Sequence, residues 1–464
     1  MSAGGIERFD VIVVGGGPAG ENAVGRCAEK GLSVALVEKE LVGGECSYWG
    51  CIPSKTLVRP GDVVAAARRA PGAAEAVTAE ISAAAAFAQR DYMTSNWTDD
   101  RQVKWLREIG ATLVRGVGRL IGERTVEVDE GGTTRRLEAA RAVVIATGTV
   151  PAIPPIEGLA DVRAWTNRDA TQAHEVPRRL VVLGGGAAGI ELAQAYKRLG
   201  SAEVTVLEGG PRLIGREEPF AGDQVRAAFE AEGIRVLTEV RATDARRNGA
   251  VTVTLEDGRE VAGDELFVSV GRRTATSDIG LETVGLEPGR PIEVDDSLRA
   301  KGVDGAWLYA VGDVNGRAPL THMGKYQARL AADAILGHEV NAFADTLAVP
   351  RVTFTDPQVA AVGLTEADAR EQGFPVRAVT TPTGGVAGAY TRGNGIDGTC
   401  KLVVDEDRSV LLGATFTGPD MQELLHSATV AIVGAIPLET LWHAVPSFPT
   451  VSEVWLRLLE AYGL

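Results

Sequence analysis

Two cysteines five residues apart are the first residues in this sequence whose type and spacing suit chemistry. Cys46 and Cys51 lie in the segment GGECSYWGCIPSK, residues 43–55. The spacing differs from a CxxC zinc knuckle, and no second cysteine pair or histidine cluster completes four zinc ligands, so a metal site is disfavoured. A helix N-terminus and Lys55 would both favour a thiolate, and Pro53 would distort any helix here. We therefore interpret the pair as redox-active, with two buried structural cysteines as the alternative.

Two glycine-rich loops are the second feature that suits ligand binding. Each follows an apolar strand-like run, opens a helical stretch and fits G-x-G-x-x-G, with Gly15, Gly17 and Gly20 in the first and Gly184, Gly186 and Gly189 in the second. The first glycine allows a tight turn, the second lets the backbone approach a pyrophosphate, and the third lets the helix pack on the strand. The helix N-terminus offers N–H groups to the phosphates. Each loop therefore predicts a dinucleotide site.

The two loops belong to an internal near-repeat, residues 10–38 and 180–208. Each copy ends in a glutamate, Glu38 or Glu208, placed 18 or 19 residues past its third glycine. Such a carboxylate accepts a hydrogen bond from a ribose 2′-OH and repels a 2′-phosphate, so Glu208 favours NAD over NADP. Arg212 could soften that preference, although a solvated arginine is the simpler interpretation. Two dinucleotides in one chain suggest FAD plus NAD, with NADP still possible.

Further elements must position these residues. The patterns predict two helices within residues 59–114, short strands within 126–144, a β-meander over 234–270, a short strand at 307–310, and alternating strands and helices over 347–464. Domain boundaries are expected near residues 151, 275 and 346. The two glycine loops by themselves predict two nucleotide-binding domains.

Composition narrows the function classes. The 464 residues suggest about three domains. The net charge of −15 disfavours nucleic-acid and membrane-surface roles. The longest apolar stretches are near ten residues, well short of a bilayer span, and the N-terminus lacks the pattern of a secretory signal. Four cysteines are too few for a secreted disulfide scaffold, so we expect a cytoplasmic protein.

Three more motifs carry a family resemblance: VVIATGTVP at 143–151, VGRRT at 270–274 and YAVGDVNG at 309–316. With the glycine loops and the cysteine segment, they make the chain resemble the pyridine nucleotide–disulfide oxidoreductases, the family of dihydrolipoamide dehydrogenase, glutathione reductase and mercuric reductase. The resemblance covers nearly the whole length. It implies an α/β fold with two Rossmann-like dinucleotide-binding domains and a C-terminal α+β dimerisation domain, and hence a homodimer.

The resemblance also implies domain limits and cofactor contacts. The FAD-binding domain would take residues 1–151, the NAD-binding domain 152–275, the second, central part of the FAD-binding domain 276–346, and the dimerisation domain 347–464. The FAD contacts would be the first loop's glycines, Glu38, Lys55, Thr147, Gly148 and Asp313, the last of which matches the aspartate that holds the ribityl chain. The NAD contacts would be the second loop's glycines, Glu208 and Gly271.

The resemblance further implies catalytic roles. Cys51 would face the flavin and form its charge-transfer complex, and Cys46 would be the outward interchange thiol. Lys55 and Glu191 match the pair beside the flavin and nicotinamide, although Glu191 alone would also suit an ordinary helix surface. Electrons would pass from NADH to FAD, to Cys51, to the Cys46–Cys51 disulfide and then to a small-molecule acceptor, or back from a dithiol.

Two positions depart from the family pattern. Phe448 stands where the family's C-terminal His-Pro-Thr-x-x-Glu has its acid–base histidine, while Glu453 keeps the glutamate and is predicted to be catalytic. Phenylalanine cannot move a proton, and losing a general base costs about 10²–10⁴-fold in rate. His443 could substitute, but a buried or capping histidine is the simpler interpretation. Between the cysteines, the rings of Tyr48 and Trp49 would either pack against neighbours or alter the approach to Cys46.

Three functions remain open on these residues. The intact cysteine pair favours an enzyme like dihydrolipoamide dehydrogenase that acts on a dithiol or disulfide. Phe448 favours instead an NAD(P)H:quinone, dye or metal-ion reductase acting mainly through the flavin. A non-catalytic dimeric flavoprotein is the third possibility, and Lys55 and Glu191 speak against it.

Overall fold

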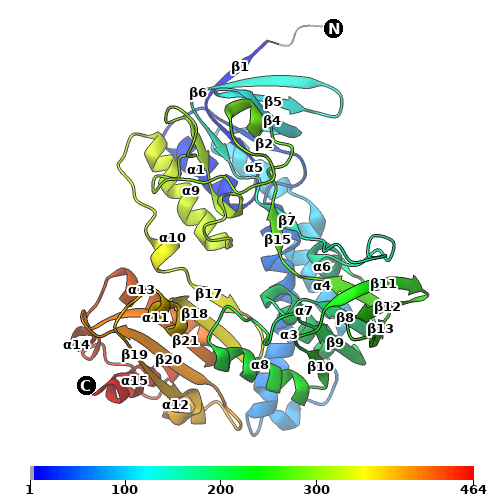
Figure 1. The fold of residues 1–464 in the computed structure, drawn as a ribbon, viewed down its shortest axis with the longest axis vertical. Coiled ribbons are helices and arrows are strands. Elements are labelled where there is room, and N and C mark those ends of the chain that lie inside the picture. Colours follow the sequence, from blue (N-terminus) through cyan, green and yellow to red (C-terminus); the bar gives the residue numbers. More distant parts are fainter. Residues whose placement is uncertain (1–4) are drawn as a thin grey trace. The chain divides into compact units, whose positions relative to one another are not determined.

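The computed structural model of the protein describes residues 5–464, which fall into two compact units. The first unit combines the residues up to 53 with 91–152 and 272–346. The second combines 54–90, 153–271 and 347–464, and Figure 1 colours the chain through both in sequence order. The second unit thus contains both the part with the second glycine loop and the C-terminal part. The four-part domain organisation expected from the sequence therefore stays a prediction.

A seven-stranded sheet lies at the centre of the first unit. Its order is β3-β2-β1-β6-β5-β4, and β16 also pairs with β6. Strands β1, β2, β3, β6 and β16 are parallel, whereas β4 and β5 add antiparallel pairs. Their bounds are β1 (Glu7–Val14), β2 (Val34–Glu38), β3 (Thr112–Arg115), β4 (Val117–Gly122), β5 (Thr125–Asp129), β6 (Thr134–Ile145) and β16 (Leu308–Ala310). Apolar runs such as 11–14 are buried throughout, as parallel strands covered on both faces require.

Four helices and a small ribbon complete the first unit. The helices are α1 (Pro18–Glu29), α2 (Gly44–Tyr48), α5 (Asp100–Glu108) and α9 (Thr321–Ile335), and α1 packs closely against α9. The ribbon pairs β7 (Thr149–Pro151) with β15 (Arg272–Thr274) in antiparallel fashion. Pro18 opens α1 at a position where a proline loses no hydrogen bond.

The second unit contains three sheets. The parallel sheet has the order β10-β9-β8-β14, with β8 (Arg179–Leu183), β9 (Glu203–Leu207), β10 (Ile234–Leu237) and β14 (Glu265–Val268). Beside it in the sequence is an antiparallel meander of β11 (Ala242–Asn248), β12 (Ala250–Leu255) and β13 (Glu260–Gly263). The C-terminal antiparallel sheet has the order β17-β18-β21-β20-β19, with β17 (Arg351–Thr353), β18 (Gln358–Gly363), β19 (Val376–Pro382), β20 (Thr399–Asp405) and β21 (Val410–Gly418).

Helices accompany these sheets. Those of the second unit are α6 (Asn167–Gln172), α7 (Ala187–Leu199), α8 (Pro219–Ala231), α11 (Glu366–Glu371), α12 (Ala387–Tyr390), α13 (Met421–Val433), α14 (Leu438–Leu441) and α15 (Val454–Tyr462). Where the chain passes from one unit to the other lie α3 (Cys51–Arg69), α4 (Ala83–Met93) and α10 (Ala344–Leu347). Single 3₁₀ turns occur at Ala74–Ala76, Ser95–Trp97, Leu281–Val284, Gly312–Asn315, Thr383–Gly385 and Val451–Glu453.

Three local predictions need correction. Residues 59–114 contain parts of three helices and not two, because α3 already begins at Cys51 and runs into this range. Pro53 does not distort that helix, since it occupies the first turn, where a backbone N–H has no helical partner to lose. The predicted meander over 234–270 is limited to β11–β13, because its first and last strands join the parallel sheet.

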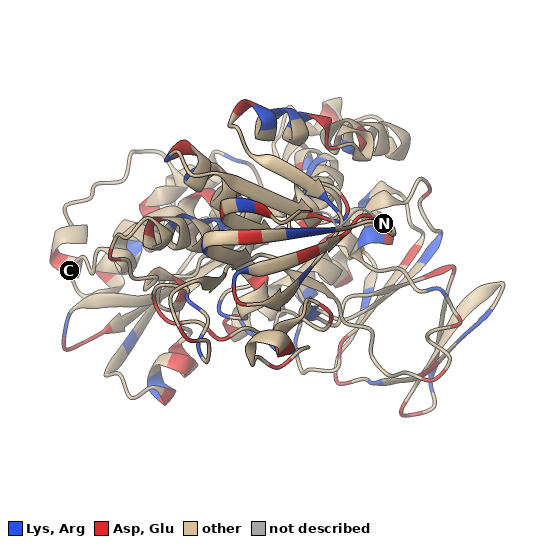
Figure 2. Ribbon diagram, turned by 90° about the horizontal axis from the view of Figure 1, so that it is seen from above, with Lys and Arg blue, Asp and Glu red and all other residues tan. Residues whose placement is uncertain are grey.

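Charge is dispersed over the fold. Figure 2 shows lysine and arginine interspersed with aspartate and glutamate along the ribbon, with no basic stripe running along any helix in that view. None of the helices within residues 5–464 is both long and apolar enough to cross a membrane.

Candidate redox site

The first glycine loop has the shape that a dinucleotide site requires. Gly15 adopts φ +105°, and a side chain there would collide with the Ala146 carbonyl oxygen at 2.4 Å. A Cβ on Gly20 would lie 1.9 Å from the Gly15 oxygen, so only glycine lets α1 approach the strand this closely. Around a Cβ built on Gly17, by contrast, no atom of the described residues beyond its chain neighbours lies within 4 Å. The loop therefore leaves open space at the one position where a pyrophosphate would approach the backbone.

Glu38 is held at the end of β2 by this same loop. Its two carboxylate oxygens accept the Gly16 and Glu40 backbone N–H groups, each at 2.6 Å. Burial raises the pKa of the carboxyl group, and these two hydrogen bonds oppose that shift. A carboxylate oxygen has a second lone pair, so Glu38 keeps the capacity to accept a ribose hydroxyl.

Thr147, Gly148 and Asp313 lie close by in the first unit. The buried Thr147 hydroxyl has no hydrogen-bond partner among the described residues, and nothing lies within 4 Å of where a Gly148 side chain would be. The Thr149 hydroxyl donates to Asp313 at 2.7 Å and accepts from the Arg272 Nε at 2.7 Å. A polar cofactor such as FAD fits these three residues. The buried Thr147 hydroxyl would gain a hydrogen-bond partner, Gly148 leaves space for the cofactor, and the Asp313 carboxylate is held in a fixed orientation.

Cys46 and Cys51 come together at the junction of two helices. Cys46 lies on the short α2, and Cys51 is the first residue of α3. Both are half-buried thiols, hydrogen-bonded to each other, and Cys51 Sγ lies 3.3 Å from the Thr321 hydroxyl of α9. The other two cysteines are buried elsewhere: Cys27 within α1 and Cys400 on β20. The structure thus places a dithiol of two adjacent sulfurs beside α9.

The surroundings of Cys46 disfavour its thiolate form. The hydrogen bond with Cys51 and burial both raise the pKa of the Cys46 thiol, and the Thr321 hydroxyl and the Lys325 ammonium only partly oppose them. Which sulfur of the pair carries a thiolate stays a prediction, because two adjacent thiols titrate as a pair. Deprotonating Cys46 in this reduced form therefore needs a proton acceptor.

The rings between the cysteines pack inward. Tyr48 and Trp49 are buried, and the Tyr48 hydroxyl donates to the Val42 and Thr98 carbonyl oxygens. Trp97 Nε1 in turn donates to the Tyr48 carbonyl oxygen. The structure therefore favours the packing interpretation of these aromatic residues over a role as a stacking surface for an acceptor.

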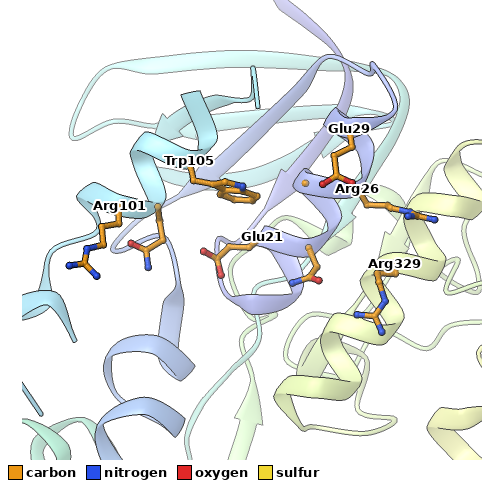
Figure 3. A pocket seen from close by; sticks show the side chains of 9 residues that line it. Glu21, Arg26, Glu29, Arg101, Trp105 and Arg329 are labelled. Atoms are coloured by element: carbon orange, nitrogen blue, oxygen red, sulfur yellow. The ribbon is translucent and has the colours of Figure 1, made fainter. Parts of the chain in front are cut away.

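A cavity of about 590 Å³ opens in the same unit. As Figure 3 shows, side chains from α1, α5 and α9 line it: Glu21, Asn22, Arg26, Glu29, Arg101, Gln102, Trp105 and Arg329, with Gly25 under the Trp105 ring. Thr321, Lys325 and Arg329 follow one another at four-residue spacing and so share one face of α9. That face runs from the dithiol to the cavity.

The second glycine loop repeats the geometry of the first. Gly184 has φ +111°, a Cβ on Gly189 would lie 2.4 Å from the Gly184 oxygen, and no atom lies within 4 Å of a Cβ on Gly186. Glu208 accepts the backbone N–H groups of Gly185 and Gly210 at 2.6 Å each. Arg212 lies 3.9 Å from Asp223. This pairing weakens the suggestion that Arg212 recruits a 2′-phosphate.

Lys55 and Glu191 form an ion pair within the second unit. The Lys55 Nζ donates to Glu191 Oε2 at 2.5 Å, and Glu191 Oε1 accepts the Phe354 backbone N–H at 2.9 Å. The Glu191 side chain is only 3 % exposed, against 36 % for Lys55. Glu191 is therefore not an ordinary helix-surface glutamate, because burial of a carboxylate requires such a partner.

The remaining predicted residues lie at exposed or C-terminal positions. Gly271 is exposed, with φ +137° and open space around its Cβ position. Phe448 is 77 % exposed and His443 is also exposed, so His443 is not the buried histidine of the simpler interpretation. Glu453 is buried, and its Oε2 has no hydrogen-bond partner among the described residues. The catalytic role of Glu453 and the NAD contact of Gly271 stay predictions.

Sequence reasoning missed four residues that the structure adds to the site: Glu21, Thr321, Lys325 and Arg272. Glu21 directly follows the third glycine of the first loop, and the other three lie about 250 to 300 residues later, too far for spacing to connect them to it. The four-residue spacing of Thr321, Lys325 and Arg329 is the one pattern in the sequence that could have shown that these residues share a helix face.

Among residues 5–464, no group of three or more histidine, cysteine, aspartate or glutamate side chains is arranged to hold a metal ion.

Comparison with known proteins identifies relatives along the whole chain. Residues 9–328 match the family described as pyridine nucleotide-disulphide oxidoreductase, and residues 349–458 match the dimerisation domain of that family. The chain is 34 % identical over 465 residues to a dihydrolipoyl dehydrogenase of Haloferax volcanii, covering 97 % of this chain and 95 % of that protein. It is 30 % identical over 450 residues to a mercuric reductase of Staphylococcus aureus, covering 96 % and 81 %.

Solved structures agree with the fold. LpdA from Mycobacterium tuberculosis matches with a TM-score of 0.86 at 26 % identity, covering 99 % of this chain and 100 % of that one. The HOCl-induced flavoprotein disulfide reductase RclA from Escherichia coli matches with a TM-score of 0.85 at 25 % identity, covering 97 % and 99 %. These matches confirm the expected α/β fold with two Rossmann-type nucleotide-binding parts and a C-terminal dimerisation domain.

Proposed function

We propose, from the premise that this chain belongs to the pyridine nucleotide–disulphide oxidoreductase family, that it exchanges electrons between NADH and a small disulfide or dithiol through Cys46 and Cys51. The family binds FAD and uses NAD(P)H, and the chain is a flavin-dependent disulfide oxidoreductase enzyme. Which acceptor it serves is the part that we infer. When bound, FAD supplies the two-electron relay between the nicotinamide and the dithiol.

One observation carries the proposal: two hydrogen-bonded thiols lie beside a helix face that leads to a cavity lined by polar side chains. Adjacent thiols suit two-electron exchange, because a mixed disulfide formed on one sulfur is resolved by the other. Cys46 would form the mixed disulfide and Cys51 would resolve it, with the Thr321 hydroxyl oriented on the Cys51 sulfur. The cavity of α1, α5 and α9 is the place for the substrate.

Glu208 supports NAD as the preferred nicotinamide cofactor. Its carboxylate is fixed by two backbone N–H groups at the end of β9, where a ribose 2′-OH would be recognised and a 2′-phosphate repelled. We expect NADH to be used at least tenfold better than NADPH, measured as kcat/KM. Glu208→Gln should narrow that ratio, because it removes the repelling charge and keeps the shape.

An acceptor panel tests the proposal. Wild type, Cys46→Ser and Cys51→Ser are assayed with lipoamide, glutathione disulfide, a benzoquinone and Hg²⁺, with each nicotinamide cofactor. We expect lipoamide reduction that both serine variants abolish, while NADH still bleaches the flavin. Cys400→Ser is the matched control, since it removes a buried thiol outside the site and can keep the contact with Thr383. Colourless purified protein, or lipoamide reduction unaffected by Cys46→Ser, would refute the proposal.

Phe448 favours a second candidate, an NAD(P)H reductase of quinones, dyes or metal ions. An exposed phenylalanine in place of the family histidine supplies no proton for thiol exchange. A relative named mercuric reductase has the same general organisation at 30 % identity. In the panel, quinone or Hg²⁺ reduction that persists in Cys46→Ser and exceeds the lipoamide rate would favour this candidate.

We also infer a homodimer. The C-terminal part matches a dimerisation domain, and within it Trp442, Val445 and Phe448 lie within seven residues and are 38, 83 and 77 % exposed. Neighbouring exposed apolar side chains of this size favour burial against another protein surface. Light scattering should give about twice the 48.7 kDa of one chain. A cytoplasmic location, expected from the sequence, stays a prediction.

A further inference from the structure

Glu21 occupies an unusual place for a carboxylate. It lies in the first turn of α1, one residue past Gly20, and lines the 590 Å³ cavity. In Figure 3 its carboxylate projects toward the side of the cavity formed by α5, below the Trp105 ring, whereas Glu29 lies two turns farther along α1. Glu21 therefore lines the end of the cavity that is nearest the first glycine loop, where it would contact a bound ligand.

No group in the described part of the chain holds the Glu21 carboxylate. Among the described residues it makes no hydrogen bond or ion pair, although Asn22 and Arg26 on the same helix do: Arg26 pairs with Asp333 at 3.0 Å. Burial raises the pKa of Glu21 to about 7, with Glu38 adding to the effect and Lys325 opposing it. Arg101 and Arg329, the other cations of the cavity, make no ion pair in the described part of the chain. Glu21 thus exchanges its proton near neutral pH, as an acid–base group must.

The same surroundings connect Glu21 to Cys46. The start of α2 lies directly on the first glycine loop: Gly43 N–H donates to the Gly16 oxygen at 2.7 Å, and a Cβ on Gly44 would lie 2.7 Å from Gly17 Cα. Cys46 is two residues beyond that contact. Lys325 of α9 acts electrostatically on both the Cys46 thiol and the Glu21 carboxylate. The charge of Glu21 also reaches Tyr48, two residues after Cys46.

We propose that Glu21 is the acid–base residue for thiol–disulfide exchange at Cys46. Phe448 stands where the family has the histidine that performs this role, and a phenylalanine side chain cannot move a proton. The inference rests on the proposed function, because it assigns a role within the exchange reaction. Glu21 must exchange a proton with the sulfur of a substrate lying in the cavity and with the Cys46 sulfur, directly or through one water. The ligand is therefore a small dithiol or disulfide whose reacting sulfur lies between α1 and α2.

The step balances as follows for a dithiol substrate and the oxidised Cys46–Cys51 pair. The Glu21 carboxylate takes the proton of one substrate thiol as that sulfur attacks Cys46. The Cys46–Cys51 bond breaks, its electron pair goes to the Cys51 sulfur, and a mixed disulfide forms on Cys46. The second substrate sulfur attacks the first, releasing the oxidised substrate and losing its proton to solvent. Cys46 leaves as a thiolate and takes the proton from Glu21, so two electrons stay on the enzyme.

Glu21→Gln in the FAD-containing enzyme tests this role, with Glu108→Gln as the matched control. The control substitution removes the same charge from a glutamate on α5 whose side chain is 62 % exposed and does not line the cavity. With dihydrolipoamide and NAD⁺, we expect kcat/KM of Glu21→Gln to fall about 10²-fold. The wild-type rate should rise with pH through about 7 as Glu21 ionises, and this rise should be absent in Glu21→Gln. Glu21→Asp should recover part of the rate.

A second measurement does not depend on the substrate. Cys46 of the NADH-reduced enzyme is alkylated with iodoacetamide at pH 8. If Glu21 accepts protons, Glu21→Gln slows alkylation; if it is only a neighbouring negative charge, the same change speeds alkylation, because a nearby anion disfavours the thiolate. Faster or unchanged alkylation, or a dihydrolipoamide rate equal to that of Glu108→Gln, would overturn the role of Glu21. If wild type and Cys46→Ser react alike with dihydrolipoamide, the proposed function fails instead.

Discussion

The two glycine loops of this protein are nearly the same structure put to different uses. Both begin with a glycine at φ +105° or +111°, and in both the third glycine packs against the carbonyl oxygen of the first. In both, a glutamate carboxylate accepts a loop N–H at 2.6 Å. They differ in the next carboxylate along the helix. Glu191 on α7 is paired with Lys55 and a backbone N–H, whereas Glu21 on α1 has no partner within residues 5–464 and faces a cavity. The same motif therefore places one carboxylate against a cation and an N–H donor and leaves the other facing a cavity.

This difference shows that a carboxylate's chemistry is set by its neighbours and not by its place in a motif. A buried carboxylate with a cation and an N–H donor is stabilised as an anion. One that is buried without them is stabilised in its neutral form until the pH approaches its raised pKa. Substitutions in each loop test whether these different surroundings determine cofactor binding, stability and activity.

The largest effect is expected from Gly20→Ala. The added methyl group would lie 1.9 Å from the Gly15 carbonyl oxygen, so the loop must move. We expect loss of bound flavin and a fall of at least about 3 kcal/mol in the free energy of unfolding. Gly189→Ala, where the corresponding distance is 2.4 Å, should instead keep the flavin and lose NADH binding. Flavin absorbance and chemical denaturation measure both, and retained flavin in Gly20→Ala would contradict the assignment.

The second largest effect is expected from Lys55→Met, because this substitution removes the cation that pairs with the buried Glu191 carboxylate. Breaking a fully buried pair costs about 3–5 kcal/mol, and the partial exposure of Lys55 lowers our expectation to about 2–3 kcal/mol of unfolding free energy. Lys104→Met is the control, since its pair with Glu108 spans 3.8 Å between exposed side chains and should contribute under about 1 kcal/mol. Equal effects in a urea titration would show that Glu191 does not depend on Lys55.

Glu21→Gln should change stability in the opposite direction. The folded protein holds the Glu21 proton up to a pKa of about 7, whereas the unfolded chain releases it near 4.5, so ionised Glu21 lowers stability as the pH rises through that window. At pH 8 we expect the variant to be more stable than wild type by about 1–2 kcal/mol, and at pH 4.5 by less than about 0.5 kcal/mol. Thermal unfolding at both pH values measures this. Glu191→Gln should destabilise at either pH, and a loss for Glu21→Gln at pH 8 would remove the contrast.

The smallest effect is expected from Thr321→Ala. It removes one hydroxyl 3.3 Å from the Cys51 sulfur, and such a hydrogen bond contributes about 1 kcal/mol. We therefore expect less than a tenfold change in the lipoamide rate, while Thr321→Ser, which keeps the hydroxyl, should match wild type. A change as large as that of Cys46→Ser would mean that α9 contributes more than one hydrogen bond to the dithiol.

The sequence by itself determined the parts of this protein that depend on neighbours in the chain. Glycine spacing, the acids that end each repeat and the two cysteines predict the nucleotide loops and the dithiol, because a turn, a helix start and a strand end are local structures. The sequence also showed the loss of the family histidine at Phe448.

Only the tertiary structure decided which distant residues share the site. Thr321, Lys325 and Arg329 reach the cysteines and the cavity through the packing of α9 on α1, and Glu191 is paired because Lys55 and the Phe354 backbone meet it. Protonation follows from such encounters, since burial and the nearest charges fix a pKa, and neither can be read from spacing along the chain. That is why Glu21 looked like an ordinary first-turn glutamate in the sequence and lies as an unpaired carboxylate in a cavity in the fold.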